Sequence, residues 1–218
     1  THPHEDHIYE IPKLYQRRTH KIQYRPKAAF DIAPKAQTPL HINIADSANN
    51  MNATYNSPVS DEDSIENPSA VGGVKITIVP PVASLQDKDD LNTYSMLAIV
   101  EYEGYKIVLS GDNPKRQLQY MVDNNFHGIR NLVSNATILL APHHGRTGEF
   151  CKDFFDCVNP ILTIISDKSI EHTTQEESSS IYKGRGANLY GRDRYVLTTR
   201  NDGDIAFNVS KWSCSVSI

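Results

Sequence analysis

The sequence has no long hydrophobic run, and this absence removes one large class of functions. None of its apolar stretches approaches the roughly 18–20 residues that a helix needs to cross a bilayer. Cysteine is also scarce, because Cys151, Cys157 and Cys214 are too few and too scattered for a disulfide framework. We therefore expect a chain without a membrane segment that folds in a reducing compartment, the cytoplasm.

An excess of basic residues is missing as well. The 218 residues include 22 Lys and Arg against 26 Asp and Glu, so the formal net charge is −4. Proteins that bind nucleic acid without sequence preference usually carry a broad basic surface, which this composition does not predict. The composition does not exclude a nuclease, because a local strip of cations and bound metal ions can offset the negative net charge.

The length predicts a single domain over residues 1–218, with enough chain to bury a hydrophobic core. Residues 8–18 have the apolar spacing of a short amphipathic helix. Residues 19–73 differ in kind, since they are rich in Pro, Asn, Ser and Ala. We interpret this range as a partly irregular insertion, and its length favours a functional role over a plain connector.

From residue 74 onward, predicted strands alternate with predicted helices. Apolar residues on one face indicate helices over 114–126 and 150–158. The turn signal Asn201-Asp202-Gly203 predicts that the last two strands form a hairpin. This alternation is typical of a layered α/β protein. The predicted strands cover residues 74–81, 95–104, 105–112, 136–142, 161–166, 194–199 and 204–210.

The strongest chemical signal is the run from His2 to His7, which reads His-Pro-His-Glu-Asp-His. In an extended segment His2 and His4 point the same way, whereas Asp6 and His7 can swing round a turn to face a second position. Imidazole suits zinc, and a carboxylate suits a harder cation. The run therefore predicts ligands for two adjacent metal ions, against the plainer interpretation of a His-rich tag or solvated loop.

Two more groups of polar residues come directly after predicted buried strands. Asp112 ends the run Ser-Gly-Asp, where a carboxylate can bridge two metal ions and Gly111 lets the backbone approach closely. His143 and His144 belong to the run Pro-His-His-Gly-Arg. Adjacent histidines project differently, so one can bind a metal while the other orients it or contacts substrate. Alone, these groups could be a common turn and two surface histidines, but the His run favours a shared metal site.

The remaining candidates have plainer interpretations. His172 follows the predicted strand over 161–166 and is either a site residue or a solvated loop histidine. His20, His41 and His127 lack any such context. Several cations could form a phosphate-binding strip, although scattered solvated charges are the more ordinary interpretation. These cations are Arg116, Arg130, Arg146, Lys183, Arg185, Arg192 and Arg194.

The order of these motifs resembles that of the metallo-β-lactamase fold superfamily. The HxHxDH run comes first, followed by a strand ending in Ser-Gly-Asp and then a strand ending in Pro-His-His-Gly. More narrowly, the chain is similar to the metallo-hydrolase domain of ComEC-type DNA-uptake proteins and their stand-alone relatives. The motif Asn92-Thr-Tyr-Ser95 and the segment from Thr199 to Ile205 add to the resemblance. It covers residues 1–18 and 74–209 and leaves out the insertion.

The resemblance implies an αββα sandwich with a dinuclear zinc site, for which manganese is the alternative metal. It implies that His2 and His4 hold the first ion, and that Asp6, His7 and one of His143 and His144 hold the second. Asp112 would bridge the two ions, and a metal-bound hydroxide would attack the substrate. The other histidine of the pair, or His172, would donate a proton to the leaving oxygen. The implied catalytic residues are Asp6, Asp112, His144 and His172.

Three departures from the family pattern shape the expectations. Strands that normally precede the HxHxDH run are not in this chain, so we expect further domains or partner proteins to surround it. Asn92 stands near the place of a histidine that completes the first metal site in many members. Arg146 replaces the serine of the usual His-His-Gly-Ser, which changes the contacts open to a substrate.

The leading hypothesis is a metal-dependent phosphodiesterase with nucleic acid, and DNA in particular, as the candidate partner. The alternatives are a small-molecule hydrolase that acts on a lactone, β-lactam, thioester or phosphocholine ester, and a non-catalytic sensor or binding module with a degenerate metal site. A shared superfamily fold does not choose among these functions.

Overall fold

The computed structural model describes Lys13, Ser60 and residues 64–168 and 178–218. Ten strands lie within these residues, and several of them agree with the alternating and continuous apolar runs of the sequence. Their bounds are β1 (Lys75–Val79), β2 (Leu97–Tyr102), β3 (Tyr105–Leu109), β4 (Ile138–Leu140), β5 (Leu162–Ile165), β6 (Ala187–Leu189), β7 (Arg192–Arg194), β8 (Val196–Thr198), β9 (Ala206–Val209) and β10 (Cys214–Ser217).

The helices of the described residues are mostly short. Their bounds are α5 (Lys115–Asp123), α6 (Ile129–Val133), α7 (Lys152–Val158), α8 (Ser178–Ile181) and α9 (Thr199–Asp202). Single turns of 3₁₀ helix connect other elements, namely η1 (Pro68–Val71), η2 (Ala83–Leu85), η3 (Leu91–Tyr94), η4 (Phe126–Gly128), η5 (Pro142–Gly145) and η6 (Thr147–Glu149). No helix in the described part of the chain combines the length and the apolar character that crossing a membrane requires.

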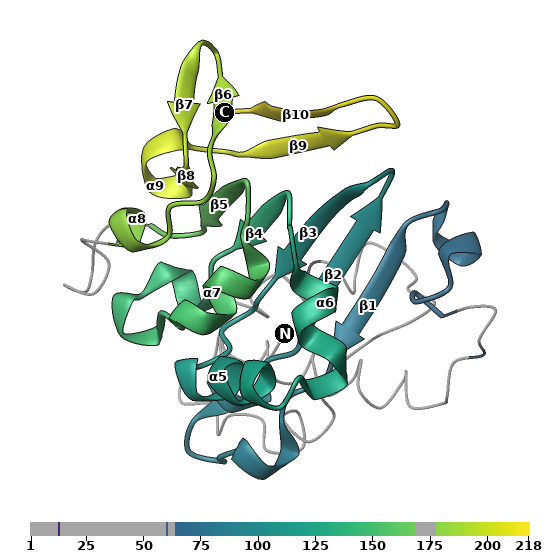
Figure 1. Cartoon of the computed structure of the whole chain (residues 1–218), viewed down its shortest axis with the longest axis vertical. Coiled ribbons are helices and arrows are strands. Elements are labelled where there is room, and N and C mark those ends of the chain that lie inside the picture. The colour runs from purple at the N-terminus through teal and green to yellow at the C-terminus, as the bar shows by residue number, and fades with distance from the viewer. Residues whose placement is uncertain (1–12, 14–59, 61–63, 169–177) are drawn as a thin grey trace.

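Six strands form one mixed sheet in the order β1-β2-β3-β4-β5-β8 (Figure 1). β1, β2 and β3 pair antiparallel, and the turn between β2 and β3 lies at Glu103-Gly104, both with positive φ. From β3 onward the pairing is parallel, so β3, β4, β5 and β8 all run the same way. Parallel neighbours need crossover connections, and α5, α6 and α7 lie in the first two of them.

The sheet has a helical layer on one face and a strand layer on part of the other. α5, α6 and α7 cover the first face (Figure 1), where Leu118, Met121 and Phe154 are buried against Ile99 and Leu139. On the second face, buried apolar side chains of β4, β5 and β8 pack against Phe207, Cys214 and Val216 from β9 and β10. The described residues therefore form a mixed α/β fold in layers, as the sequence predicts.

Most predicted elements are confirmed, with shorter bounds. Strands lie within 74–81, 95–104, 105–112, 136–142, 161–166, 194–199 and 204–210, and a helix lies within 150–158. The predicted helix over 114–126 ends at Asp123, and Phe126 belongs to a separate turn. Lys13 is helical, but the rest of 8–18 and most of the predicted insertion lie outside the described residues.

The predicted hairpin between 194–199 and 204–210 is wrong. β8 pairs parallel with β5 instead, and β9 pairs with β10, which the sequence does not reveal. The turn signal at Asn201-Asp202-Gly203 is part of the helical turn α9. Thr198 caps α9 by accepting a hydrogen bond from the Asn201 amide, and the Asp202 carboxylate accepts from the Thr198 amide. These local bonds favour a helical turn over a two-residue hairpin loop.

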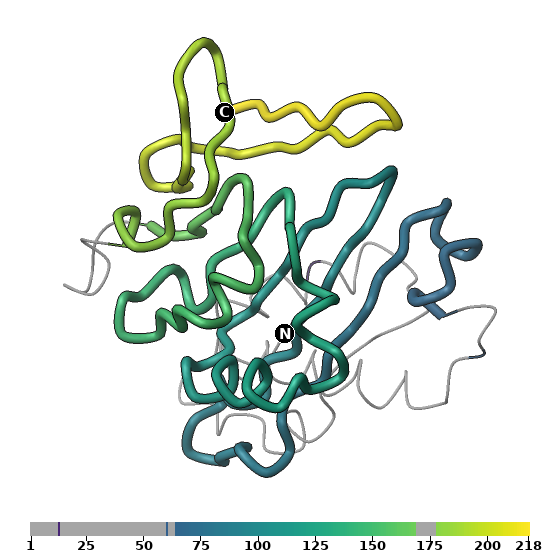
Figure 2. Tube along the Cα trace, viewed as in Figure 1, coloured from purple at the N-terminus to yellow at the C-terminus, as the bar shows by residue number. Residues whose placement is uncertain are grey.

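The end of the chain lies beside the short sheet formed by β6 and β7, as Figure 2 shows. The hydroxyl of Tyr190, between β6 and β7, donates a hydrogen bond to the Val216 carbonyl oxygen at 3.0 Å. This contact ties the β6–β7 hairpin to β10. It explains how two small two-stranded sheets, which are marginal alone, support each other at this side of the molecule.

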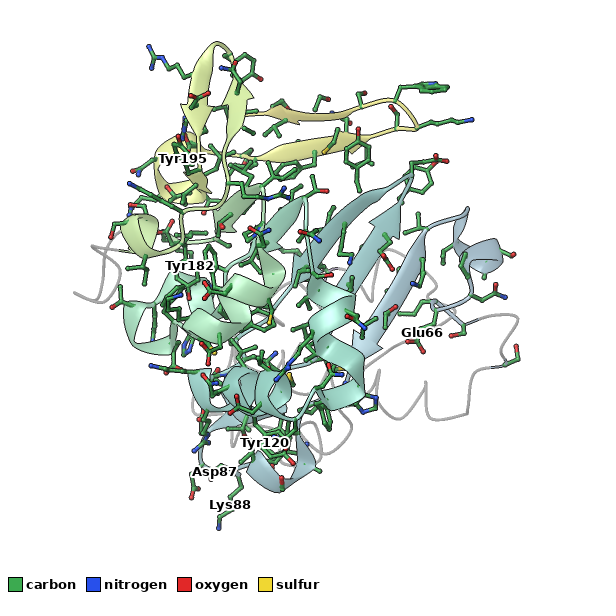
Figure 3. The ribbon with its side chains drawn as sticks, in the orientation of Figure 1. Glu66, Asp87, Lys88, Tyr120, Tyr182 and Tyr195 are labelled. Carbon is green, nitrogen blue, oxygen red and sulfur yellow. The ribbon has the colours of Figure 1, made fainter. Side chains whose placement is uncertain are left out.

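Tyr182, labelled in Figure 3, is a buried phenol whose hydroxyl finds no hydrogen-bond partner among the described residues. Its ring packs against Phe150 and Phe155 at centroid distances of 4.9 and 5.8 Å. Burial raises the pKa of Tyr182, and the charge of Glu149 adds to the rise. Packing of the ring thus stabilises the buried side chain, whereas the unpaired hydroxyl lowers the free energy of unfolding.

We expect Tyr182→Phe to raise the free energy of unfolding by about 1 kcal/mol, because it removes an unsatisfied buried hydroxyl and keeps the ring.

The raised pKa means that only the unfolded chain ionises this phenol above a pH of about 10. Wild-type stability should therefore fall as pH rises through that value, and the advantage of Tyr182→Phe should grow there. Urea denaturation at two pH values measures both effects. A lower free energy of unfolding in Tyr182→Phe would show that the Tyr182 hydroxyl does form a stabilising hydrogen bond.

Candidate functional site

Polar residues follow each of the four parallel strands, and parallel strands end at one edge of a sheet. Asp112 follows β3, and His143 and His144 follow β4. Asp167 follows β5, and Arg200 follows β8. Ligands of open α/β sheets bind outside the carboxyl ends of the strands. This edge is therefore the candidate functional site.

The loop after β3 places a buried carboxylate at this edge. Gly111 has a φ of +55°, and the Asp112 side chain is only 6% exposed. The Asn113 side chain donates to the Ser110 carbonyl oxygen at 2.7 Å, which closes the turn on itself. The His143 amide donates to the Gly111 carbonyl oxygen at 3.1 Å, so the loops after β3 and β4 are joined through their backbones.

The turn after β4 holds its two histidines in an unusual backbone conformation. His143, His144 and Gly145 have φ values of +47°, +55° and +72°, all in the left-handed region. Residues with a Cβ rarely adopt this region, and each such residue costs about 1–3 kcal/mol. A Cβ on Gly145 would lie 3.0–3.1 Å from the Ile165 side chain, so this glycine also packs tightly against β5. This backbone conformation sets the direction in which both side chains leave the turn.

His144 bridges two of the strand ends. Its Nδ1 lies 2.7 Å from the Ser166 carbonyl oxygen, after β5, and its Nε2 lies 3.6 Å from Asp112 Oδ2, after β3. A carbonyl oxygen only accepts, so Nδ1 carries the hydrogen and the lone pair of a neutral ring is on Nε2. Two ligand atoms on one tetrahedral zinc ion lie roughly 3.4 Å apart, given bonds of about 2.0–2.1 Å. The spacing of Nε2 and Oδ2 fits such a pair.

His143 is half-buried beside this pair, and its ring centroid is 6.3 Å from that of His144. Its Nδ1 is buried and has no hydrogen-bond partner among the described residues. Burial lowers the pKa of His143, which the charge of Asp112 partly offsets and the charge of Arg146 strengthens. A metal ion binds the neutral imidazole, which a lowered pKa favours at His143, and Asp112, His143 and His144 are of the residue types that bind zinc or manganese.

Two further contacts hold the surrounding loops in place. The fully buried Gln117 side chain of α5 accepts from the Val82 amide at 2.9 Å and donates to the Thr93 carbonyl oxygen. The Glu149 carboxylate accepts from the Lys115 amide at 2.8 Å, at the start of α5, where the helix dipole favours an anion. The first turn of α5 therefore anchors the segments that carry Val82, Thr93 and Glu149.

The structure brings together three of the residues that the sequence predicts for the site, namely Asp112, His143 and His144. The other predicted residues, which are His2, His4, Asp6, His7 and His172, lie outside the described residues. Within the described ranges no three His, Cys, Asp or Glu side chains form a complete metal-binding group. His127 is exposed and stacks edge-on with Phe126, as expected of an ordinary surface residue.

Asp167, Thr199 and Arg200 lie at the same edge but are not among the site residues predicted from the sequence. Asp167 stands at the end of an apolar strand, as Asp112 does, so the same signal could have identified it. Glu149 is not among them either, because nothing in a single sequence shows that its carboxylate meets the amide of Lys115. The chain matches no known protein-family model. No curated protein is significantly similar to it in sequence.

The contact between Gly145 and Ile165 can be tested against a glycine with a similar backbone conformation. Gly191 has a φ of +77° and open space where a Cβ would lie, whereas Gly145 faces Ile165. We expect Gly191→Ala to lower the free energy of unfolding by about 1–2 kcal/mol through backbone strain alone. Gly145→Ala should lower it by about 1–3 kcal/mol more, because Ile165 must also move. Equal losses, measured by chemical denaturation, would show that the contact is not tight.

Proposed function

We propose that this chain is a metal-dependent hydrolase of the metallo-β-lactamase fold class, resembling ComEC-type metallo-hydrolase domains, and that it cleaves phosphodiesters. One observation carries the proposal. Asp112 and His144 come from different strand ends, and their ligand atoms face each other at 3.6 Å with the orphaned Nδ1 of His143 nearby in the chain. A buried carboxylate and two imidazoles at the carboxyl edge of a parallel sheet are a donor set for zinc.

Asp112, His143 and His144 would hold metal, together with His2, His4, Asp6 and His7 from the start of the chain. Two zinc ions are the proposed occupants, with manganese as the alternative. When bound, such cations activate a water molecule near neutral pH and stabilise the negative charge of the transition state. The Ser166 carbonyl oxygen fixes the ring of His144, and the strained turn fixes His143. We assign His172 the role of proton donor to the leaving oxygen.

Cations at the strand ends favour an anionic substrate. Lys115, Arg146 and Lys168 follow β3, β4 and β5, and none of them forms an ion pair among the described residues. Arg146 follows the histidine pair directly, and its charge acts on His143 together with the opposite charge of Glu149. Arginine recognises phosphate oxygens with paired hydrogen bonds. These charges support a phosphodiester, and nucleic acid as the partner, over a neutral lactone or β-lactam.

Hydrolysis by the full chain, loaded with zinc or manganese, tests the proposed function. The substrates are single-stranded DNA, plasmid, RNA, a chromogenic phosphodiester, a β-lactam and a lactone. We expect phosphodiester cleavage, and Asp112→Asn should lower kcat/KM more than about 100-fold because the proposed bridging carboxylate is lost. Asp204→Asn makes the same charge change at an exposed residue and should change kcat/KM less than about twofold.

Full activity in Asp112→Asn, with an unchanged metal content, would contradict the assigned centre. Cleavage of the β-lactam or lactone alone would replace the phosphodiesterase with the small-molecule hydrolase.

Arg146→Gln tests the substrate charge separately. We expect it to raise KM for a phosphodiester about 10-fold with little change in kcat, because the guanidinium binds the substrate and its transition state alike. The effect should shrink at high ionic strength, since salt screens the attraction. Lys211→Gln removes an exposed cation beside Trp212 and serves as the control. An unchanged KM in Arg146→Gln would show that Arg146 does not bind the substrate.

A further inference from the structure

One peptide group, which links Ser166 to Asp167, contacts the ring of His144 at Nδ1. The carbonyl oxygen of this peptide contacts His144 Nδ1 at 2.7 Å. A peptide group is planar, and in the trans form its carbonyl and its N–H point in opposite directions. Whatever holds the Asp167 N–H therefore also aims the Ser166 carbonyl at His144.

Thr199 holds this peptide from its other side. The Asp167 amide donates to Thr199 Oγ1 at 2.9 Å, and the Thr199 hydroxyl donates to the Asp167 carbonyl oxygen at 2.6 Å. One hydroxyl thus serves both the N–H and the carbonyl of the same residue. Thr199 is the first residue after β8, so the end of β8 fixes the backbone at the end of β5.

An ion pair strengthens this connection between the two strand ends. The Asp167 carboxylate is fully buried, and its Oδ2 lies 2.8 Å from Arg200 Nη1, on a side chain that is 19% exposed. The N–H of Arg200 Nη1 is not aligned for a hydrogen bond, so the attraction is mainly electrostatic. The Arg200 amide approaches the other carboxylate oxygen at 3.4 Å. Buried charges of this kind occur where they are paired.

We propose that Asp167, Thr199 and Arg200, together the Asp167 clamp, are positioning residues that hold His144 in the Nδ1–H tautomer with Nε2 directed at Asp112. A partner that fixes the tautomer of a metal-binding imidazole commonly changes metal affinity 10- to 100-fold when it is lost. The metal role of His144 rests on the proposed function. The orientation and tautomer do not, because the contacts that set them belong to this chain alone.

The first arm of the test uses the metal-free full chain. Imidazole nitrogen NMR shifts, assigned with His144→Gln and followed over a pH series, report both the protonation state and the tautomer of His144. We expect the Nδ1–H form in the wild type and a mixture of both tautomers in Thr199→Val. Thr199→Ser keeps the hydroxyl and should restore the wild-type shifts. Arg200→Gln provides a second disruption of the clamp if Thr199→Val does not fold.

Thr163→Val is the matched control for Thr199→Val. Thr163 is fully buried in β5, and its hydroxyl has no hydrogen-bond partner among the described residues. Thr163→Val makes the same replacement of a hydroxyl by a methyl group in the neighbouring strand, but at a residue that is not part of the clamp. It should leave the tautomer of His144 as in the wild type. An Nε2–H ring in the wild type, or unchanged shifts in both Thr199→Val and Arg200→Gln, would overturn the clamp.

The second arm measures zinc binding by the same proteins. We expect Thr199→Val to weaken zinc affinity 10- to 100-fold, and Thr199→Ser and Thr163→Val to leave it close to that of the wild type. If the wild type binds no zinc, the proposed function fails while the NMR arm still decides the clamp. If zinc binds equally to the wild type and Thr199→Val although the tautomer changes, His144 is positioned by the clamp but is not a zinc ligand.

Discussion

The parallel pairing of β3, β4, β5 and β8 is the constraint on which the candidate site depends. Because these four strands run the same way, the residues that follow them gather at one edge, although they are far apart in the sequence. The apolar faces of β4 and β5 keep this pairing in place from both sides, with helices on one face and β9 and β10 on the other. Asp112 and His144 meet at 3.6 Å as a consequence of this arrangement, without any local sequence motif that joins them.

The loops at this edge are held more firmly than ordinary connections. The backbone bond from His143 to Gly111 joins two of them, and the tight packing of Gly145 on Ile165 sets a third element against the same turn. Two consecutive histidines in the left-handed region store strain that the surrounding packing must offset. Strain of this kind is found where side chains need fixed directions. A metal centre benefits from such fixed directions, since contacts that orient its ligands raise its affinity for the ion.

The sequence predicts the part of the site that local patterns encode. Apolar runs locate β3, β4 and β5, and polar residues directly after them identify Asp112, His143 and His144. A strand at β8 is predicted, but its partner could not be, because the pairing with β5 is non-local and the adjacent Asn-Asp-Gly turn favours a hairpin on local grounds. The roles of Thr199 and Arg200 depend on that pairing, so the sequence alone could not predict them either. Asp167 could have been predicted, since it follows a buried strand as Asp112 does.

The proposed metal site lies at the carboxyl ends of β3 and β4 and consists of Asp112 and the histidine pair. An anomalous diffraction map of the full chain crystallised with zinc tests it most directly. We expect a zinc peak within about 2.0–2.3 Å of an Asp112 carboxylate oxygen and of an imidazole nitrogen of His143 or His144. Zinc bound only elsewhere in the chain, with Asp112 and both histidines outside its coordination sphere, would contradict the account.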